Sequence, residues 1–565
     1  MYIRIEEKQT VYMPGITSLW VSFNYDETIV SYIKELEFAV YYKDLRAWEI
    51  PLTYLSAIIT RFINEAEIDL ILTPEHKVQA NYQLLDVNLK SNPFPHQIDA
   101  VEFGLNNKGW ILGDEPGLGK TLSVIDLALQ LKAQGKISHC LIVCGINSIK
   151  LNWAEEIEKH SGATYKVLGR RKRKKKDTWY MGSMQDKIDD IMTPTDDFFF
   201  ITNIETFRDE TFLEALYQTP MLINLWAIDE AHKCKGINSK QGAGILTCKY
   251  PVYKIAMTGT PLHNKPTDAY VSLAWTENER SKPGTFLKYY TVKNSDGEVV
   301  GYRNLNMLKY SVQHCMLRRL KKDIFDLPEK IISHEYVEMS KDQEELYKTV
   351  VNNVKKNPIV DKVKLSLSPM ANWIRLRQAT SNPKILSTKS ISCAKLDRME
   401  ELVEEITDNG GKVVVVSNWT MVTDEIKERL KKYNYVEYTG KLSEEDRAIN
   451  KKAFQNDPNV KVFIGTISTM GAALTLTAAQ TMIIVDNVWN ASDLKQLTDR
   501  LHRIGTTGVV NIIILVTRNT VDELVEDIID LKGMVSDYVV DGEVPEGNLN
   551  KILLEYLKNT WQYGI

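Results

Sequence analysis

The stretch GDEPGLGKT at residues 113–121 places three glycines, a lysine and a threonine between two apolar segments. An apolar run precedes it at 110–112, and the apolar residues of LSVIDLALQLKAQG follow it at helical spacing. A glycine-rich turn between a strand and a helix points backbone N–H groups toward the helix N-terminus, where an anion is favoured. Lys120 can reach the outer phosphates of a nucleotide, and the Thr121 hydroxyl can ligate Mg²⁺. The stretch therefore predicts a strand–loop–helix unit with a nucleotide site.

The match to a phosphate-binding loop is incomplete. Asp114 stands where the strict pattern has glycine. A plain glycine-rich turn with an exposed lysine is the alternative, and a second motif has to decide between the two.

Residues 221–232 supply that motif, because MLINLWAIDEAH is an apolar strand that ends in two acids. Asp229 can hold magnesium, and Glu230 can orient and deprotonate the water that attacks a γ-phosphate. Solvated carboxylates at a strand end are the alternative. The separation of roughly 110 residues from Lys120 is what a parallel αβ core needs to bring both groups to one sheet edge.

Two arginines near the C-terminus form a third candidate group. Residues 496–505 read QLTDRLHRIG, so Arg500 and Arg503 stand three apart and share a helical face. Such pairs are usually exposed to solvent. Here they can instead neutralise transition-state charge, an effect of about 10³–10⁵ in rate in GTPases.

Length and composition limit the number of domains and the classes of site that this chain can contain. At 565 residues, with 44% hydrophobic and 25% charged residues, we expect about three domains of a globular protein. The six cysteines lack metal-ligand spacing, so we predict neither a zinc site nor a disulfide framework. No apolar run has membrane-spanning length, and the N-terminus lacks a signal-peptide core, so we expect a cytoplasmic chain, or a nuclear one in a eukaryote.

The motifs GDEPGLGKT, DEAH, MTGTP, MLRRLKKDIFDLP (316–328) and DRLHRIG occur in this order. In this order they resemble those of the Snf-type ATPases of helicase superfamily two, over about residues 90–535. The resemblance implies an α/β fold with two RecA-like parallel-sheet lobes, helical insertions, and ATP with Mg²⁺ in the cleft between the lobes. It also implies DNA as the partner of a monomeric motor, contacted mainly through its backbone.

The same resemblance assigns roles by motif. Catalysis is implied for Lys120, Asp229, Glu230, Arg500 and Arg503. Nucleotide contacts are implied for Gln97, Asp114, Gly117, Leu118, Gly119, Lys120 and Thr121. Magnesium ligation is implied for Thr121 and Asp229. Coupling to the nucleic acid, or contact with it, is implied for His232, Thr258, Gly259, Thr260, Asn418, Thr466 and Gln496.

One motif points to a branch of the family. Leu474-Thr475-Leu476 resembles the annealing-helicase branch, in which threonine replaces an asparagine. Ala473 and Thr506 depart from the usual glycine and glutamine. Residues 20–63 read as strand, helix, strand and helix, similar to the HARP-type module of that branch; a generic α+β appendage is the alternative.

We predict an appendage at 1–85, a first lobe at 86–270, helical protrusions and a linker at 271–394, a second lobe at 395–535 and a C-terminal helix at 536–565. The basic run RRKRKKK at 170–176 is a solvated loop, a phosphate-contacting loop or a nuclear-import signal.

The hypothesis that follows is an ATP-dependent DNA translocase that remodels or anneals duplex or branched DNA, as a DNA-stimulated ATPase. A strand-separating helicase and a remover of DNA-bound protein are alternatives in the same class. A DNA-binding scaffold without hydrolysis and a small-molecule kinase are alternatives from other classes. The presence of all five candidate catalytic residues argues against the scaffold, and the kinase has no use for the second-lobe arginines.

Overall fold

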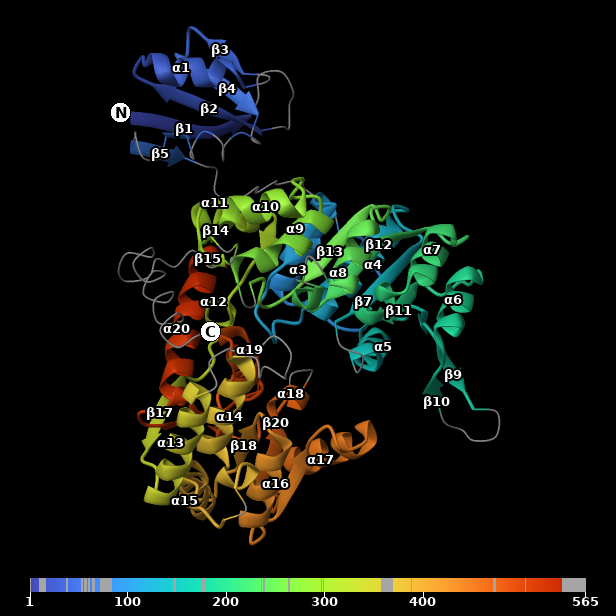
Figure 1. The fold of residues 1–565 in the computed structure, drawn as a ribbon. Helices are drawn as coiled ribbons and strands as arrows, with labels where there is room; N and C mark the ends of the chain where they lie inside the picture. The colour runs from blue at the N-terminus through green and yellow to red at the C-terminus, as the bar shows by residue number, and fades with distance from the viewer. Residues whose placement is uncertain are drawn as a thin grey trace. The chain divides into compact units, whose positions relative to one another are not determined.

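The computed structural model describes residues 2–540 apart from 10–16, 37–38, 52–53, 55–57, 59–60, 63–66, 72–83, 146–148, 174–178, 235, 237–238, 263–264, 296, 298, 357–368, 388, 471–473 and 504. The chain divides into two compact units, one of Met1–Asn81 with Asn304–Tyr310 and one of Tyr82–Arg303 with Ser311–Ile565. Figure 1 shows the course of the chain through both.

The N-terminal unit is a five-stranded sheet in the order β3-β4-β2-β1-β5. Its elements are β1 (Tyr2–Gln9), β2 (Thr17–Phe23), α1 (Glu27–Lys34), β3 (Val40–Tyr42), β4 (Ala47–Pro51) and β5 (Glu67–Ile71). Asp26 begins α1 by accepting hydrogen bonds from the N–H groups of Thr28 and Ile29. The helix buries Ile29 and Ile33, so the unit has an apolar core of its own. Its second predicted helix falls largely on residues outside the described ones.

The first lobe is built on a seven-stranded parallel sheet in the order β16-β6-β13-β12-β7-β11-β8. Its strands are β6 (Gly109–Leu112), β7 (His139–Cys144), β8 (Tyr165–Val167), β11 (Phe199–Asn203), β12 (Ile223–Asp229), β13 (Tyr253–Met257) and β16 (Met316–Leu317). Its helices are α3 (Pro95–Asn106), α4 (Lys120–Ala133), α5 (Ile149–His160), α6 (Met184–Met192), η2 (Ile204–Arg208), α7 (Glu210–Gln218), η3 (Ala231–Cys234) and α8 (Lys240–Thr247). Every residue of β11 and β13 is buried, as expected for a parallel sheet covered on both faces.

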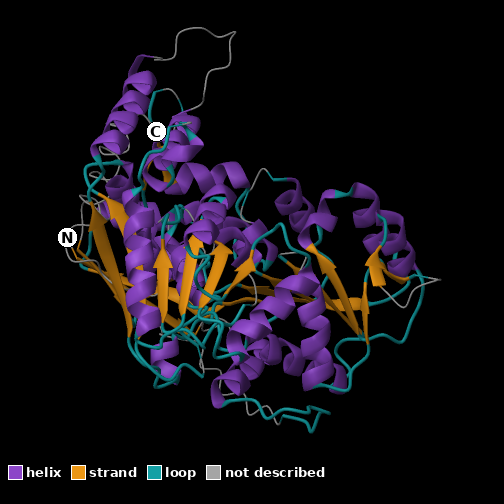
Figure 2. Cartoon of the chain, turned by 90° about the horizontal axis from the view of Figure 1, so that it is seen from below, coloured by secondary structure: helices purple, strands orange, loops and turns teal. Residues whose placement is uncertain are grey.

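The second lobe repeats this architecture with six parallel strands in the order β17-β22-β21-β18-β20-β19. It contains α15 (Ala394–Asp408), β18 (Val413–Ser417), α16 (Thr420–Arg429), β19 (Tyr435–Tyr438), α17 (Glu444–Asn456), β20 (Val462–Thr466), α18 (Ile467–Met470), β21 (Thr481–Ile484), α19 (Ala491–Thr498), β22 (Val510–Thr517) and α20 (Val521–Val540). In Figure 2 the strands lie between helices. The predicted α/β class with two parallel-sheet lobes is confirmed.

The segment between the lobes is less uniformly helical than expected. It holds η4 (Pro266–Ala269), α9 (Tyr270–Trp275), α10 (Pro283–Tyr290), β14 (Thr291–Lys293), β15 (Val299–Tyr302), α11 (Leu305–His314), α12 (Lys321–Ile324), β17 (Lys330–Val337), α13 (Lys341–Lys356), α14 (Pro369–Ser381) and η5 (Pro383–Ile385). β16 pairs with β6 and β17 pairs with β22, so this segment adds an outer strand to each sheet. Such additions depend on pairing partners far away in the sequence, which local periodicity does not reveal.

The basic run also differs from the expected loop. Arg170–Lys172 form β9, which pairs antiparallel with β10 (Trp179–Met181). At the other end of the chain α20 continues to Val540, past residue 535, and the tail predicted to be a helix lies beyond it, outside the described residues. No helix within the described residues is long and apolar enough to cross a membrane.

Candidate nucleotide site

The glycine loop lies between β6 and α4, and its conformation requires glycine at two positions. Gly117 has φ +96° and Gly119 has φ +78°, both in the left-handed region. Gly119 is also the N-cap of α4, so the loop ends at a helix N-terminus. A Cβ on Gly119 would lie 2.2 Å from Nε2 of Gln97, which leaves no room for a side chain.

The Gln97 side chain is hydrogen-bonded to the backbone of this loop. Its Nε2 donates to the carbonyls of Leu118 at 3.3 Å and Gly119 at 3.2 Å, and its Oε1 accepts from the Phe94 N–H at 2.9 Å. The neighbouring His96 ring contacts the Leu118 carbonyl at 2.8 Å. The start of α3 therefore holds the loop backbone in place.

Lys120 follows the loop as the first residue of α4. Its Nζ donates to the carbonyls of Asp114 at 2.7 Å and Glu115 at 3.3 Å. Burial lowers the pKa of Lys120, while the charges of Glu230, Asp114 and Asp229 oppose that change. Thr121 stands beside it on the first turn of α4. A lysine that has lost hydration and binds carbonyls is suited to an added anion.

Asp114 has a different structural role from the one its position in the motif implied. Arg319 donates two hydrogen bonds to the Asp114 carboxylate, one from Nε at 2.9 Å and one from Nη2. It also donates to the His96 carbonyl. Asp114 is 1% exposed. It therefore braces the loop against the chain that follows β16, and a direct contact between its side chain and a nucleotide stays a prediction.

The two acids of the DEAH motif lie at the carboxyl end of β12. Trp153 on α5 donates from Nε1 to Oδ2 of Asp229 at 2.9 Å. Burial, with the adjacent charge of Glu230, raises the pKa of Asp229 to about 6. Glu230 has φ +50°, an uncommon conformation for a residue with a side chain. A Cβ on Gly145 would lie 2.8 Å from that of Glu230, so a glycine at the end of β7 makes room for this turn.

A chain of contacts leads from Glu230 across the lobe. His232 Nδ1 lies 3.3 Å from Glu230 Oε2 and 3.2 Å from the Thr258 hydroxyl. The Thr258 hydroxyl accepts from the Thr260 N–H at 3.1 Å, and Gln496 on α19 donates to the Thr260 hydroxyl at 3.3 Å. A Cβ on Gly259 would lie 2.7 Å from Pro116. The turn at 258–260 therefore contacts the glycine loop and α19, and is connected to Glu230 through His232.

The arginines of the second lobe face the loop and the acid. Arg503 lies beside the glycine loop, since a Cβ built on Gly117 would be 3.8 Å from Arg503 Cγ. Burial lowers the pKa of Arg500 while the charge of Glu230 opposes it, and burial together with Arg500 lowers the pKa of Arg503 to about 10. Arg500 is buried and Arg503 partly buried, and two cations that have lost hydration and repel each other are suited to an anion.

Arg503 is held by the two threonines that set this sequence apart. Its Nη1 donates to the Thr475 hydroxyl at 3.2 Å, and its backbone N–H donates to the Thr506 hydroxyl at 3.1 Å. Its Nε donates to the Asp499 carbonyl at 3.0 Å. Residues 471–473, which include Ala473, lie outside the described part of the chain.

Further charged contacts join the lobes at the loop. Lys495 on α19 lies 2.5 Å from Glu115, whose Oε2 accepts from the Lys321 N–H at 2.7 Å. Lys321 and Lys330 each lie 3.0 Å from one carboxylate oxygen of Asp499. The glycine loop thus contacts α19, which ends at Thr498 before the two arginines. The prediction that Arg500 and Arg503 share a helical face is wrong, because both lie in the turn that follows this helix. Sequence motifs did not identify Trp153, Gly145, Arg319 or the Glu115–Lys495 pair as parts of this site, because each acts across 76 residues or more and no local pattern records such contacts.

Two predicted nucleic-acid contacts have partners within the second lobe. Asn418 Nδ2 donates to the carbonyls of Asp486 and Asn487 at 3.1 and 2.8 Å. The Thr466 hydroxyl lies 2.7 Å from that of Thr469. Their contact with a nucleic acid stays a prediction.

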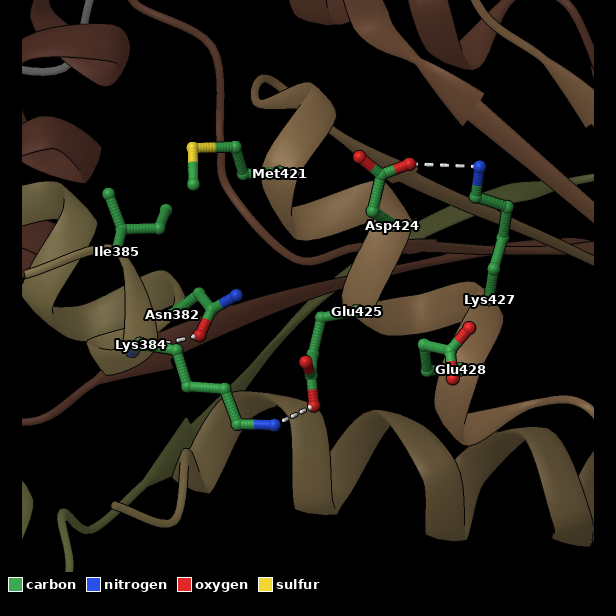
Figure 3. A pocket seen from close by; sticks show the side chains of 8 residues that line it. All are labelled: Asn382, Lys384, Ile385, Met421, Asp424, Glu425, Lys427 and Glu428. Atoms are coloured by element: carbon green, nitrogen blue, oxygen red, sulfur yellow. Dashed lines mark hydrogen bonds and ion pairs between the residues drawn. The ribbon is translucent and has the colours of Figure 1, made fainter. Parts of the chain in front are cut away.

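A separate pocket of about 420 Å³ opens on the second lobe. Figure 3 shows its lining residues, which are Asn382, Lys384, Ile385, Met421, Asp424, Glu425, Lys427 and Glu428. Its charges pair internally, with Lys384 2.7 Å from Glu425 and Lys427 2.9 Å from Asp424. The pocket therefore lacks the excess of cations that a triphosphate needs.

The chemistry of the site at the glycine loop fits a nucleotide with a divalent ion. The phosphates would meet the helix N-terminus, Lys120 and the two arginines, and the ion would meet Thr121 and Asp229. Burial lowers the pKa of the lysine and of both arginines and raises that of the Asp229 carboxylate. A bound phosphate would favour the charged forms of the lysine and arginines, and a bound cation would favour the charged carboxylate.

Comparison with known proteins agrees with this arrangement. The model of the SNF2-related domain matches residues 41–385, and the model of the helicase conserved C-terminal domain matches residues 394–505. Together they cover the first-lobe sheet and every strand of the second-lobe sheet except β22.

The curated relatives share about a quarter of the aligned residues with this chain. A chromodomain-helicase-DNA-binding protein 1-like from Mus musculus is 27% identical over 77% of this chain and 48% of its own length. The DNA annealing helicase and endonuclease ZRANB3 from Bos taurus is 25% identical over 83% of this chain and 43% of its own. The chain thus spans about half the length of the curated relatives it matches. A solved structure, the Sulfolobus solfataricus SWI2/SNF2 ATPase core in complex with dsDNA, is 25% identical with a TM-score of 0.37, covering 82% of this chain and 96% of that one.

Proposed function

The chain belongs to the SNF2-related family of helicase-like ATPases, and from this premise we propose that it is a DNA-stimulated ATPase that translocates along duplex or branched DNA and remodels or anneals it. The observation that carries the proposal is the approach of Arg503 to Gly117 together with the charge of Glu230 acting on both second-lobe arginines. One chain supplies both halves of this site, so a monomer suffices.

Each residue then has a defined task. Lys120 binds the outer phosphates, and Glu230 orients the attacking water and accepts its proton. Arg500 and Arg503 stabilise the charge that develops on the transferred group. Mg²⁺, held by Thr121 and Asp229, would neutralise phosphate charge. Trp153 keeps the Asp229 carboxylate oriented, and Gln97 keeps the loop in its binding conformation.

The contacts from Glu230 to Gln496 offer a route for coupling. His232, Thr258 and Thr260 connect the catalytic acid to α19 on the second lobe. A change at Glu230 during hydrolysis would alter these bonds and with them the fit between the lobes. Repeated opening and closing would move DNA held across both lobes.

DNA as the partner is supported by the relatives, whose names specify DNA binding, DNA annealing and helicase activity. The motif Leu474-Thr475-Leu476 supports the annealing branch, and its threonine holds Arg503. Contact would be mainly to phosphates and strongly dependent on salt.

The test is ATP hydrolysis by the full chain with no DNA, single strand, blunt duplex and fork. DNA should raise kcat of the wild type, and Lys120→Ala should remove the activity. Lys108→Ala, which changes an exposed lysine of the same lobe, should hydrolyse ATP like the wild type. Equal rates in all three proteins, or rates indifferent to every DNA, would overturn the proposal. Release of a strand from the fork without reannealing would favour a strand-separating helicase instead.

A further inference from the structure

The hairpin of β9 and β10 concentrates two kinds of exposed side chain. In Figure 1 it extends from the first lobe beyond α6. The register pairs Trp179 with Lys172, Tyr180 with Arg171 and Met181 with Arg170. Since side chains alternate along a strand, Arg170, Lys172, Trp179 and Met181 share one face.

The base of the hairpin is firmly attached to α6. Arg171 Nη1 donates to Asp190 Oδ2 at 2.8 Å, and its Nη2 donates to the Asp186 carbonyl at 2.7 Å. The Gly169 N–H donates to the same Asp190 oxygen at 2.7 Å. Arg171 therefore has a structural task, and the remaining cations of the run are carried on a fixed support.

The aromatic residues of β10 are exposed to an unusual degree. Trp179 is 54% exposed, Tyr180 45% and Met181 41%. Exposing large apolar side chains to water is unfavourable, so a patch of them on a projecting strand marks an interaction site.

Cations lie over these rings. The Arg170 guanidinium is 4.7 Å from the centre of the Trp179 ring, and that of Arg173 is 5.8 Å from the centre of the Tyr180 ring. Residues 170–176 contain seven basic residues and no acid. Rings and cations therefore alternate on one short element, which is the combination that binds unpaired bases together with their phosphates.

We infer that the β9–β10 hairpin binds single-stranded nucleic acid. One base would stack on Trp179, with phosphates on Arg170 and Lys172 of the same face, and another would stack on Tyr180 beside Arg173 on the opposite face. The inference rests on the proposed DNA-directed function and adds a second contact that the motor motifs do not include. Duplex DNA is a poorer match because its bases are already stacked, so the exposed rings would remain in water. An acidic protein would use the cations and leave the rings without a stacking partner.

The test is binding of a fluorescein-labelled oligonucleotide to the full chain, as a single strand and as a blunt duplex. Trp179→Ala with Tyr180→Ala should weaken single-strand binding about 30-fold or more, because each stacked base contributes about 1–3 kcal/mol and about 1.4 kcal/mol corresponds to a tenfold change. It should change duplex binding less than about 2-fold. Tyr217→Ala, at a tyrosine that is 77% exposed on α7, is the matched control and should bind both DNAs like the wild type.

The cations are tested by salt dependence. Arg170→Gln with Lys172→Gln and Arg173→Gln should reduce the slope of log affinity against log salt by about 2, because each phosphate contact to a single strand contributes about 0.7. Arg171 is left in place because it holds the hairpin to α6.

Three results would overturn the inference: equal losses for single strand and duplex in the aromatic variant, an unchanged salt slope in the charge variant, or displacement of the single strand by polyglutamate of the same charge. These outcomes are independent of ATP hydrolysis. Failure of the proposed motor activity would appear instead as a wild-type ATPase rate that no DNA alters.

Discussion

In each of the two parallel sheets, polar groups lie at the edge formed by the carboxyl ends of the strands. Within the part of the chain that the structure describes, their charges are left largely unpaired in the first lobe and are paired with one another in the second. In the first lobe Lys120, Asp229 and Glu230 face one another with few internal partners of opposite charge at bonding distance among the described residues. In the second lobe Lys395 lies 2.7 Å from Asp522, and Ser417 and Ser381 both donate to Asp486. One edge has charges arranged for a ligand, and the other has charges that neutralise each other.

The pKa values express the same difference. Burial raises the pKa of both Asp229 and Asp486. For Asp486 the charges of Lys395 and Arg377 offset burial from within the lobe. For Asp229 the main offsetting groups are the Trp153 N–H and Lys120, and the neighbouring Glu230 adds to the penalty. The same fold can therefore place its edge charges for catalysis or for stability.

The largest expected difference is at Glu230. Glu230→Gln keeps the shape of the side chain but removes the base, so kcat should fall about 10²–10⁴-fold. The thermal midpoint of unfolding should stay at the wild-type value, because the Glu230 side chain is only partly buried and its backbone has a strained positive φ, so the carboxylate contributes little to stability. Glu214→Gln, on an exposed position of α7, is the control for rate. A variant that lost stability in place of activity would contradict the contrast between the two edges.

At the second edge the expected result is the reverse. Lys395→Met leaves Asp522 buried without its paired cation and Asp486 with Arg377 alone, which should lower the free energy of unfolding by about 3–5 kcal/mol. The rate per folded molecule should remain near that of the wild type. Chemical denaturation measures the first quantity, with Lys432→Met, at an exposed pair with Glu404, as a control that should not alter the midpoint. If both variants unfold alike, the second network is not structural.

Trp153 offers a more modest change. Trp153→Phe removes the N–H that binds Asp229 while keeping an aromatic ring in the core, and kcat should fall about 10-fold. Since this hydrogen bond lowers the pKa of Asp229, the acid limb of the pH–rate profile should also move to higher pH. Trp226→Phe, which loses a bond to the Ile223 carbonyl, is the matched control. A loss of rate without a shift of the acid limb would assign Trp153 to packing alone.

The smallest effect concerns His334, which lies 2.7 Å from Glu526 on the second lobe. Its hydrogen bond to Glu526 raises the pKa of His334 above the ordinary value. The stabilisation is therefore fully present below about pH 6.5 and is lost as pH rises through the raised pKa. Because the pair is partly exposed, it should amount to no more than about 1 kcal/mol. Unfolding measured across this pH range should show the decline in the wild type and a flatter profile in His334→Gln.

Sequence motifs supplied the candidate residues of the site but not the residues that support them. The glycine loop, the DEAH acids and the arginine pair are short local patterns with a direct chemical meaning, and the structure brings them together. Trp153 and Arg319 act on residues 76 and 205 positions away, so their roles depend on sheet order and register. The bond of Asp114 to Arg319 was missed for the same reason, and contact of Asp114 with a nucleotide stays a prediction.

The hairpin shows another limit. The basic run at 170–176 resembles a loop by charge alone, because lysine and arginine have no strand-like alternation to display. Its strand character depends on pairing with Trp179–Met181, and its anchoring depends on Asp190. Neither could be inferred from the run itself.

The central claim is that one nucleotide is held between Lys120 and the second-lobe arginines. The most direct measurement is the DNA-stimulated kcat of Arg503→Ala together with its affinity for ATP, with Arg518→Ala on the surface of the same lobe as control. We predict a loss in kcat of about 10³-fold or more, with an ATP affinity within about 5-fold of the wild type. A kcat equal to that of the control would contradict the account.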